Sequence, residues 1–202
     1  MWILGGRASS GLKNDVWYST DGTNWTQATS SAGWSARNSH RAVVFDSKMW
    51  VMGGGRSSSD GDTGYKDVWY STDGANWTRV TNTMFNKGRG GIALTTFNSK
   101  MWVIGGGNGS TVYSKVFSSS DGKTWTDAGA RGDWSARNNH AATAFDGKLW
   151  VMGGGSNGAS LLNDVLSSSE GKNWKQVNSA ASWTPRHKHS LLVFNNKMYL
   201  LG

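Results

Sequence analysis

Cysteine is absent from the 202-residue chain, and proline and glutamate each occur once. Without cysteine the chain has no disulfide framework, no thiolate nucleophile, no iron–sulfur cluster and no cysteine-ligated zinc. No apolar run approaches the roughly 18 residues of a membrane-spanning helix, so we expect no membrane insertion. Met1 leads directly into an apolar segment, and no basic region or cleavage site of a secretory leader is visible.

Carboxylates suited to catalysis are equally scarce. Glu170 is the one glutamate, and the aspartates stand mostly at turns and strand starts, whereas a glycosidase needs two placed carboxylates. The glycine runs precede expected strands rather than helices, which excludes a dinucleotide-binding loop. His40, His140 and His189 could converge as metal ligands, but hydrogen bonding beside the inner strands is the preferred interpretation. We therefore expect no enzyme, no catalytic residue, no cofactor and no metal site.

Glycine, with 28 residues, and tryptophan, with 13, are abundant instead. A segment of the type Met-Trp-Val-Met-Gly-Gly begins at four positions and starts a fifth time: Met1, Met49, Met101, Leu149 and Met198. Recurrence at a fixed period is the signature of a repeat architecture. Residues 1–202 therefore form a single array, which divides into repeats 1–48, 49–100, 101–148 and 149–197 and the start of a fifth at 198–202.

Each repeat predicts four short strands and no helix, because no stretch shows a sustained 3.6-residue period. In one repeat the expected strands are the apolar segments 42–45 and 49–52, then 67–71, and a short strand carrying Trp77. A polar turn joins the first two strands, and an Asp-Gly turn at 73–74 joins the last two. The sequence therefore predicts an all-β fold.

The four-stranded unit of about 50 residues, with a Gly-Gly doublet and a late tryptophan, resembles the Kelch repeat, one blade of a β-propeller. These residues carry the resemblance: Gly5-Gly6, Gly53-Gly54, Gly105-Gly106, Gly153-Gly154, Trp25, Trp77, Trp125 and Trp174. The Ser-x-Asp-Gly turns are similar to the Asp-box hairpin of sialidase-type propellers, which is a structural turn. The resemblance implies a propeller with four Kelch-like blades in this chain, and a likeness to secreted bacterial propellers favours an extracellular or cell-surface location.

Closure of the ring is an open question at this stage. The chain supplies 17 expected strands, whereas four blades of four strands hold 16. Residues 190–194 could complete the blade begun by residues 1–28, in which case 198–202 would compete with 1–5 for one position. We expect a displaced segment, a ring that exchanges strands between chains, or part of a larger ring. Exposed strand edges favour pairing between chains, so a homo-oligomer is one expected partner.

Positive charge gathers in the segments that connect one repeat to the next. The chain has a net charge of +8. The connections at 29–41, 81–93, 129–141 and 178–190 hold eight basic residues and one acidic residue. In a Kelch-like blade they share a face with the glycine-rich loops 5–14, 53–66, 105–114 and 153–163, so we expect a basic rim that attracts anionic partners.

The same connections repeat a Trp-x-x-Arg-Asn constellation. The candidate ligand-binding residues are Trp34, Arg37, Asn38, Arg89, Trp134, Arg137, Asn138, Trp183 and Arg186. An aromatic face beside arginine and asparagine suits a sugar, a carboxylated glycan or an acidic peptide, because arginine binds carboxylate or sulfate in a bidentate manner. The alternative is that arginine and histidine hydrogen-bond neighbouring blades. We expect the tryptophans of this constellation at the surface and those at 2, 25, 50, 77, 102, 125, 150 and 174 in the core.

Two hypotheses of function follow, with a weaker third. The first is a non-enzymatic binding module whose basic, tryptophan-bearing face holds a protein or an acidic glycan. The second is a structural, self-assembling part that oligomerises through unpaired end strands. An enzyme acting on sugars is third, because the carboxylate pair is missing. Nucleic acid is not an expected partner, since no element is suited to enter a groove.

Overall fold

The computed structural model describes residues 1–56, 64–109, 111–156 and 160–202. Regular structure in these ranges is β-strand throughout, which confirms the all-β class expected from the repeats. No helix within these ranges is long and apolar enough to cross a membrane.

The main sheets follow one another along the chain and are antiparallel, with strands ordered from the inside outward. The first contains β1 (Trp2–Ala8), β2 (Gly11–Tyr18) and β3 (Thr26–Thr29). The second contains β4 (Asn38–Phe45), β5 (Lys48–Gly55), β6 (Val68–Ser71) and β7 (Thr78–Thr81). The third contains β8 (Ala93–Phe97), β9 (Lys100–Ile104), β12 (Val116–Ser119) and β13 (Thr126–Asp127). The fourth contains β15 (Ala141–Phe145), β16 (Lys148–Gly155), β17 (Leu161–Ser168) and β18 (Asn173–Asn178), and the fifth contains β19 (Ser190–Phe194) and β20 (Lys197–Leu201).

The structure also contains short strands that were not expected from the sequence. β10 (Gly107–Asn108) and β11 (Thr111–Val112) form a small separate hairpin. β14 (Arg131–Gly132) pairs parallel with β18 and so ties the third-to-fourth connection onto the outer edge of the fourth sheet.

Two-residue turns close the inner hairpins. Phe45 pairs with Lys48, and the residues between them, Asp46 and Ser47, have φ angles of 49° and 53°. Left-handed conformation at both central residues is the type I′ turn, whose twist matches that of the flanking strands. The polar residues of this turn tolerate that conformation, which explains why the expected hairpin forms here.

The Ser-x-Asp-Gly turns fix the outer hairpins by local hydrogen bonds. In the second sheet, the Ser71 hydroxyl accepts the Gly74 N–H at 2.7 Å, and one Asp73 carboxylate oxygen accepts the N–H groups of Ala75 and Asn76 at 2.9 and 2.8 Å. Hydrogen bonds from the Asn76 side chain and backbone are the main reason that the pKa of Asp73 lies far below its ordinary value. Matching bonds form in the first and third sheets.

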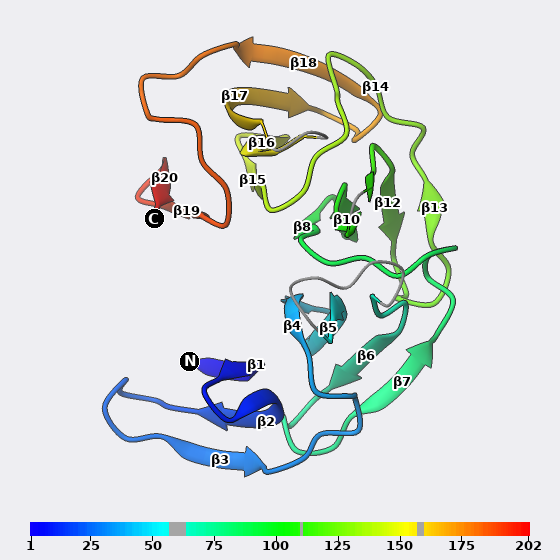
Figure 1. Cartoon of the computed structure of the whole chain (residues 1–202), viewed down its shortest axis with the longest axis vertical. Coiled ribbons are helices and arrows are strands. Elements are labelled where there is room, and N and C mark those ends of the chain that lie inside the picture. Colours follow the sequence, from blue (N-terminus) through cyan, green and yellow to red (C-terminus); the bar gives the residue numbers. More distant parts are fainter. Residues whose placement is uncertain (57–63, 110, 157–159) are drawn as a thin grey trace.

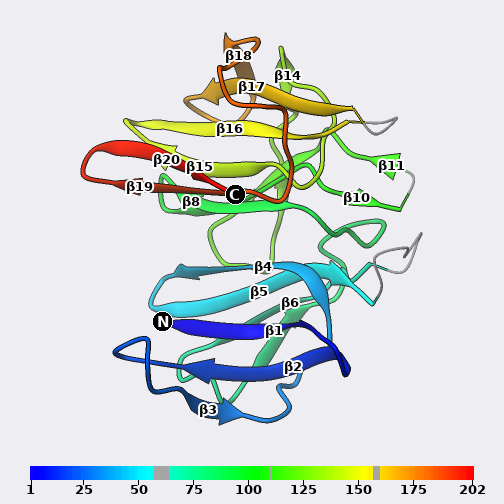
Figure 2. The same cartoon turned by 60° about the vertical axis from the view of Figure 1, so that its left-hand side comes forward.

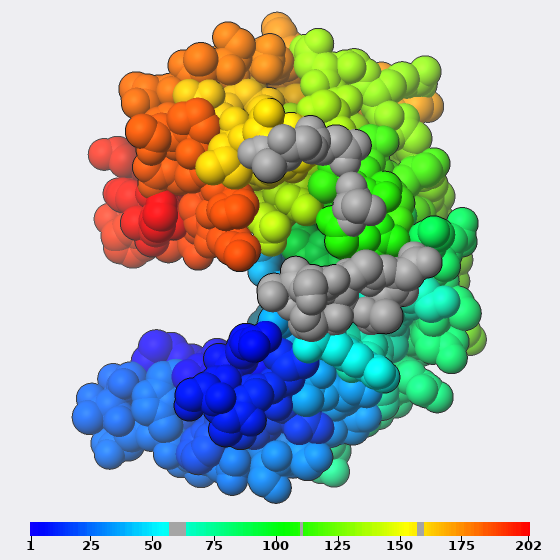
Figure 3. Space-filling model, in the orientation of Figure 1, coloured from blue at the N-terminus to red at the C-terminus, as the bar shows by residue number. Residues whose placement is uncertain are grey.

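The sheets fan around a common centre (Figures 1 and 2). Their innermost strands β4, β8, β15 and β19 are neighbours in that order, and β1 lies against β4. The space-filling view shows an opening between the first sheet and the fifth (Figure 3). The described residues therefore form an open arc.

Apolar side chains fill the spaces between consecutive sheets. Trp50 of the second sheet is 3% exposed, and its ring lies over Gly122 of the third sheet, where an added Cβ would come within 2.1 Å of the ring. Trp102 takes the same place over Gly171 of the fourth sheet. Each contact joins a strand of one sheet to the Asp-Gly or Glu-Gly turn of the next, so the core is built from sheet-to-sheet contacts.

Replacing Gly122 by alanine tests this packing, with Gly147→Ala as the matched control. Both glycines have similar φ angles, +72° and +67°, but an added Cβ at Gly147 meets nothing within 4 Å. We expect both variants to lose about 1–2 kcal/mol of unfolding free energy from left-handed strain, and Gly122→Ala to lose roughly 1–3 kcal/mol more from overpacking against Trp50. Denaturant unfolding measures both, and equal losses would contradict the proposed contact.

Candidate functional site

A row of backbone hydrogen bonds runs across the inner ends of the sheets. The Gly91 N–H donates to the Ser39 carbonyl at 3.2 Å, the Asn139 N–H to the Gly91 carbonyl at 2.7 Å, and the Lys188 N–H to the Asn139 carbonyl at 2.8 Å. These four residues hold equivalent positions in their repeats, and all are left-handed, with φ angles of 55°, 60°, 51° and 61°. The row therefore links the second sheet to the fifth through one repeated conformation.

A second row joins each sheet to the connection that enters the next. Its members are four glycine N–H groups donating to arginine carbonyls: Gly6 to Arg37 at 3.0 Å, Gly54 to Arg89 at 2.8 Å, Gly106 to Arg137 at 2.9 Å and Gly154 to Arg186 at 2.9 Å. Each arginine backbone is thus held by the preceding sheet, while its side chain extends into its own sheet.

Two of these arginines form bidentate ion pairs within their own sheets. Arg37 donates from both terminal nitrogens to the Asp67 carboxylate at 2.7 and 2.8 Å. Arg137 donates likewise to Asp164 at 2.7 and 2.9 Å. Both arginines are 0% exposed. Burial acts to raise the pKa of Asp67, but the hydrogen bonds and charge of Arg37 outweigh it and lower the pKa overall.

The third arginine, Arg89, has no carboxylate partner among the described residues. Arg89 is buried, and its guanidinium lies 4.6 Å from the Phe85 ring centroid and 4.1 Å from that of Tyr113. Lys115 occupies the position of the missing aspartate and pairs with Asp127 at 2.5 Å. Burial is the main reason that the pKa of Arg89 falls to about 10.

The tryptophans of the constellation are not surface residues, contrary to expectation. Trp34 is 1% exposed and Trp134 is 9% exposed. Trp34 packs edge-on against Trp77 at 5.8 Å, and the Trp134 indole N–H donates to the Ser114 carbonyl at 2.6 Å. Only Trp183 is half-buried. Two of the three rings therefore fill the space between sheets, because each has a neighbouring sheet against which to pack.

The expectation that these arginines form an exposed basic rim is also wrong, because neighbouring residues bury them. Arg37, Arg89 and Arg137 are buried, and two of them are neutralised by aspartates that lie far away in sequence. Arg186 is half-buried and donates to the Gly202 carbonyl. The side chains of Arg37 and Arg137 thus pair with carboxylates of their own sheets, and only their backbone carbonyls accept hydrogen bonds from the preceding sheet.

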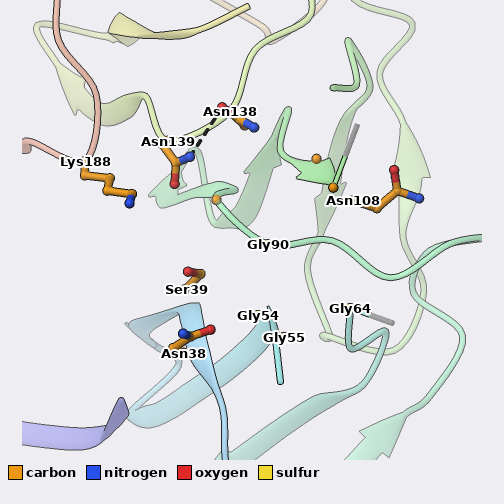
Figure 4. Close-up of a pocket in the computed structure, with 13 residues that line it drawn as sticks. Asn38, Ser39, Gly54, Gly55, Gly64, Gly90, Asn108, Asn138, Asn139 and Lys188 are labelled. Atoms are coloured by element: carbon orange, nitrogen blue, oxygen red, sulfur yellow. Dashed lines mark hydrogen bonds between the residues drawn. The ribbon is translucent and has the colours of Figure 1, made fainter. Parts of the chain in front are cut away.

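A polar pocket of about 160 Å³ lies at the inner ends of the sheets, beside the first row of hydrogen bonds (Figure 4). The residues other than glycine that line it are Asn38, Ser39, Asn108, Asn138, Asn139 and Lys188. Glycine backbone forms much of the remaining wall, and the Asn139 amide donates to the Asn138 side-chain oxygen at 3.3 Å. Of the predicted ligand-binding residues, the structure brings Asn38 and Asn138 together at this pocket, which we call the mouth pocket.

Deeper along the inner strands lies a second space of about 320 Å³, which we call the axial cavity. Arg41, His140, Lys188, His189 and Ser190 contribute its polar lining, and alanine and leucine side chains of β8, β15 and β19 line the rest. Lys188 borders both spaces. Sequence reasoning counted Arg41 and Lys188 as charge only, and it missed Ser39 and Asn139. The sequence could have indicated them by position, because residues 39, 91, 139 and 188 are equivalent in the repeats but differ in residue type.

Three of the four histidines lie beside the inner strands, with His140 and His189 buried and His40 half-buried. His140 and His189 are 1% and 4% exposed, and no group of three metal-ligating side chains occurs in the described ranges. Burial, followed by the charge of nearby arginines, lowers the pKa of His40 to about 4 and that of His140 well below its ordinary value. Burial also lowers the pKa of His189. These imidazoles are therefore neutral at pH 7.

The glycine-rich loops assigned to this face are described only in part. Residues 57–63, 110 and 157–159 lie outside the described ranges, so the expected contribution of those segments to binding stays a prediction.

Comparison with known proteins gives a similarity of fold. No protein-family model matches the sequence, and no curated protein matches it. Among solved structures, one titled "Structure of YjhT" matches with a TM-score of 0.80 at 17% sequence identity, covering 98% of this chain and 72% of that chain. At this identity the match shows a shared fold and nothing of function.

Neutral buried histidines make stability depend on pH. The unfolded chain takes up protons at histidine as pH falls below about 6.5, while the buried imidazoles stay neutral, so stability present at pH 7 is lost toward pH 5. Each such histidine contributes a slope of up to about 1.4 kcal/mol per pH unit. His140→Ile, which copies the equivalent Ile92, is expected to reduce this slope by up to that amount. Denaturant unfolding across this range measures it, with exposed His187→Asn as control, and an unchanged slope in His140→Ile would refute the assignment.

Proposed function

We propose that the chain is a non-enzymatic binding module in which Kelch-like β-propeller blades hold an acidic glycan at the mouth pocket. The observation that carries this proposal is the lining of the pocket. Asn38, Asn138 and Asn139 supply amides, Ser39 a hydroxyl and Lys188 an ammonium group. Amides and hydroxyls match the donor and acceptor pattern of sugar hydroxyls, and the ammonium favours a ligand bearing negative charge.

The propeller assignment rests on the repeated geometry. Equivalent residues make equivalent bonds from sheet to sheet, which is the behaviour expected of blades around an axis. From the count of expected strands and the open arc, we propose that the chain belongs to a larger or strand-exchanged ring.

A glycan fits this site better than a protein partner does. Protein interfaces depend on apolar and aromatic anchors that become buried on binding, whereas polar groups and glycine backbone line the mouth pocket. Its volume of about 160 Å³ is below the roughly 300 Å³ of pockets that enclose whole drug-sized ligands. The pocket therefore suits one terminal group of a glycan. No carboxylate belongs to its described lining, so we propose binding rather than hydrolysis.

Binding to an array of uronic-acid-containing and sulfated oligosaccharides, printed beside their neutral counterparts, tests the proposal. We expect acidic members to bind more tightly at low salt and to weaken as ionic strength rises. Replacing both Asn38 and Asn138 by alanine removes two sets of hydrogen bonds and is expected to weaken binding about tenfold. Asn178→Ala, on the exposed outer strand β18, is the control. No binding to acidic members, or equal binding by the double variant, would reject the proposal.

Self-association is a second candidate, favoured by the two open faces of the arc. Ile3 in the first sheet is 50% exposed, and Phe194 and Leu201 in the fifth are 61% and 50% exposed. Asp15 holds the place of Asp67 but forms no ion pair within the described ranges, and Arg186 holds the place of Arg37 without a carboxylate there. The first sheet of one copy and the fifth sheet of another are therefore complementary in charge, and each exposes apolar side chains that the contact would cover.

Sedimentation over a range of concentrations tests this second candidate. We expect the wild type to associate, and Asp15→Arg or Arg186→Asp alone to weaken association roughly tenfold or more by placing like charges together. The combined Asp15→Arg, Arg186→Asp variant re-creates opposite charges and is expected to restore association. A monomeric wild type at all concentrations would exclude it.

A further inference from the structure

Arg41 departs from the repeat at a position that faces the axis of the arc. The equivalent residues at the start of the other innermost strands are Ala93, Ala141 and Ser190, all of them small. All four residues line the axial cavity. The three small side chains leave space in the cavity, whereas the equivalent position on β4 of the second sheet holds an arginine. No requirement of the repeat explains this residue.

The surroundings of Arg41 differ from those of the structural arginines. Arg37 and Arg137 are neutralised by bidentate aspartates. Arg41 forms no ion pair within the described ranges, and its guanidinium donates one long hydrogen bond, at 3.3 Å, to the His40 carbonyl. Burial lowers the pKa of Arg41. A partly desolvated cation without a counter-charge is costly to a fold, so its presence points to a charge supplied from outside.

The remaining polar groups of the axial cavity can all donate hydrogen bonds. His140 and His189 are buried, and their ring nitrogens lack a well-aligned hydrogen-bond partner among the described residues. The backbone carbonyl of Ile104 lies beside the His140 ring and that of Met152 beside the His189 ring, each outside well-aligned hydrogen-bond geometry. Each neutral imidazole carries one N–H. Lys188 adds an ammonium group, and no carboxylate belongs to the described lining of the cavity.

We propose that the axial cavity is a binding site for a compact oxyanion, held by the Arg41 guanidinium together with the His140 and His189 imidazoles. The planar guanidinium matches a carboxylate, phosphate or sulfate group in a bidentate manner. Because Lys188 borders both spaces, an acidic group of a glycan held at the mouth pocket can reach this site. This last step rests on the proposed function, whereas binding of a free oxyanion does not.

Calorimetric titration with inorganic phosphate and with inorganic sulfate, at constant ionic strength in chloride, tests the site. We expect saturable binding by the wild type and a loss of roughly tenfold or more in Arg41→Ala, because a desolvated charged hydrogen bond is removed. Arg41→Ala copies the residue at positions 93 and 141, so we expect it to fold. Arg79→Ala, which removes the same charge from the exposed outer strand β7, is the matched control and keeps wild-type affinity.

A second measurement needs no variant. During the same titration in the wild type, the ring-proton resonances of His140 and His189 are expected to shift with a common saturation curve, while those of exposed His187 stay in place. Absence of saturable binding, equal loss in Arg41→Ala and Arg79→Ala, or unmoved His140 and His189 resonances would each overturn the proposal. Glycan binding that depends on Asn38 and Asn138 would survive such a result, so the two proposals fail separately.

Discussion

The bond from the Asn139 N–H to the Gly91 carbonyl, 2.7 Å long, is one step of the row on which the arrangement of the sheets depends. Each step requires a residue in left-handed conformation to present its N–H to one sheet and its carbonyl to the next. Glycine and asparagine adopt this conformation most readily, and lysine at 188 adopts it at some cost. A sheet that lost its place in the row would move the lining of the mouth pocket with it.

Charge is used in two different ways in this molecule. The arginines at equivalent positions of the repeat, Arg37 and Arg137, are buried with aspartates and hold each connection to the sheet that it enters. Removing one partner of such a pair leaves an uncompensated buried charge, which costs about 3–5 kcal/mol. Positive charge that is not repeated, at Arg41 and Lys188, lies instead along the axis. The net charge therefore says little about the site until the recurring and the singular cations are separated.

The sequence predicted the elements well and the environment of single side chains poorly. Period, turns and strand order follow from local residues, as the turn at Asp46 and Ser47 shows. Exposure depends on what packs opposite. Trp25 and Trp174 occupy the same place in their repeats, yet Trp174 is 3% exposed and Trp25 is 36% exposed, because the first sheet borders the opening of the arc. Trp34 was misplaced for the converse reason, since a local motif does not reveal that a neighbouring sheet covers it.

The distinction between repeated and singular residues explains where the candidate site had to be sought. A residue that recurs in every unit meets the same neighbours each time, so its recurrence is accounted for by packing between units. Recurrence of the Trp-x-x-Arg motif was therefore an argument for structure, although it drew attention as a candidate for function. A residue present once, in a position where its equivalents are small, cannot be accounted for by the repeat. Arg41 is such a residue, since its equivalents are Ala93, Ala141 and Ser190. Its position in the lining of the axial cavity is the reason for assigning it a role in binding an oxyanion.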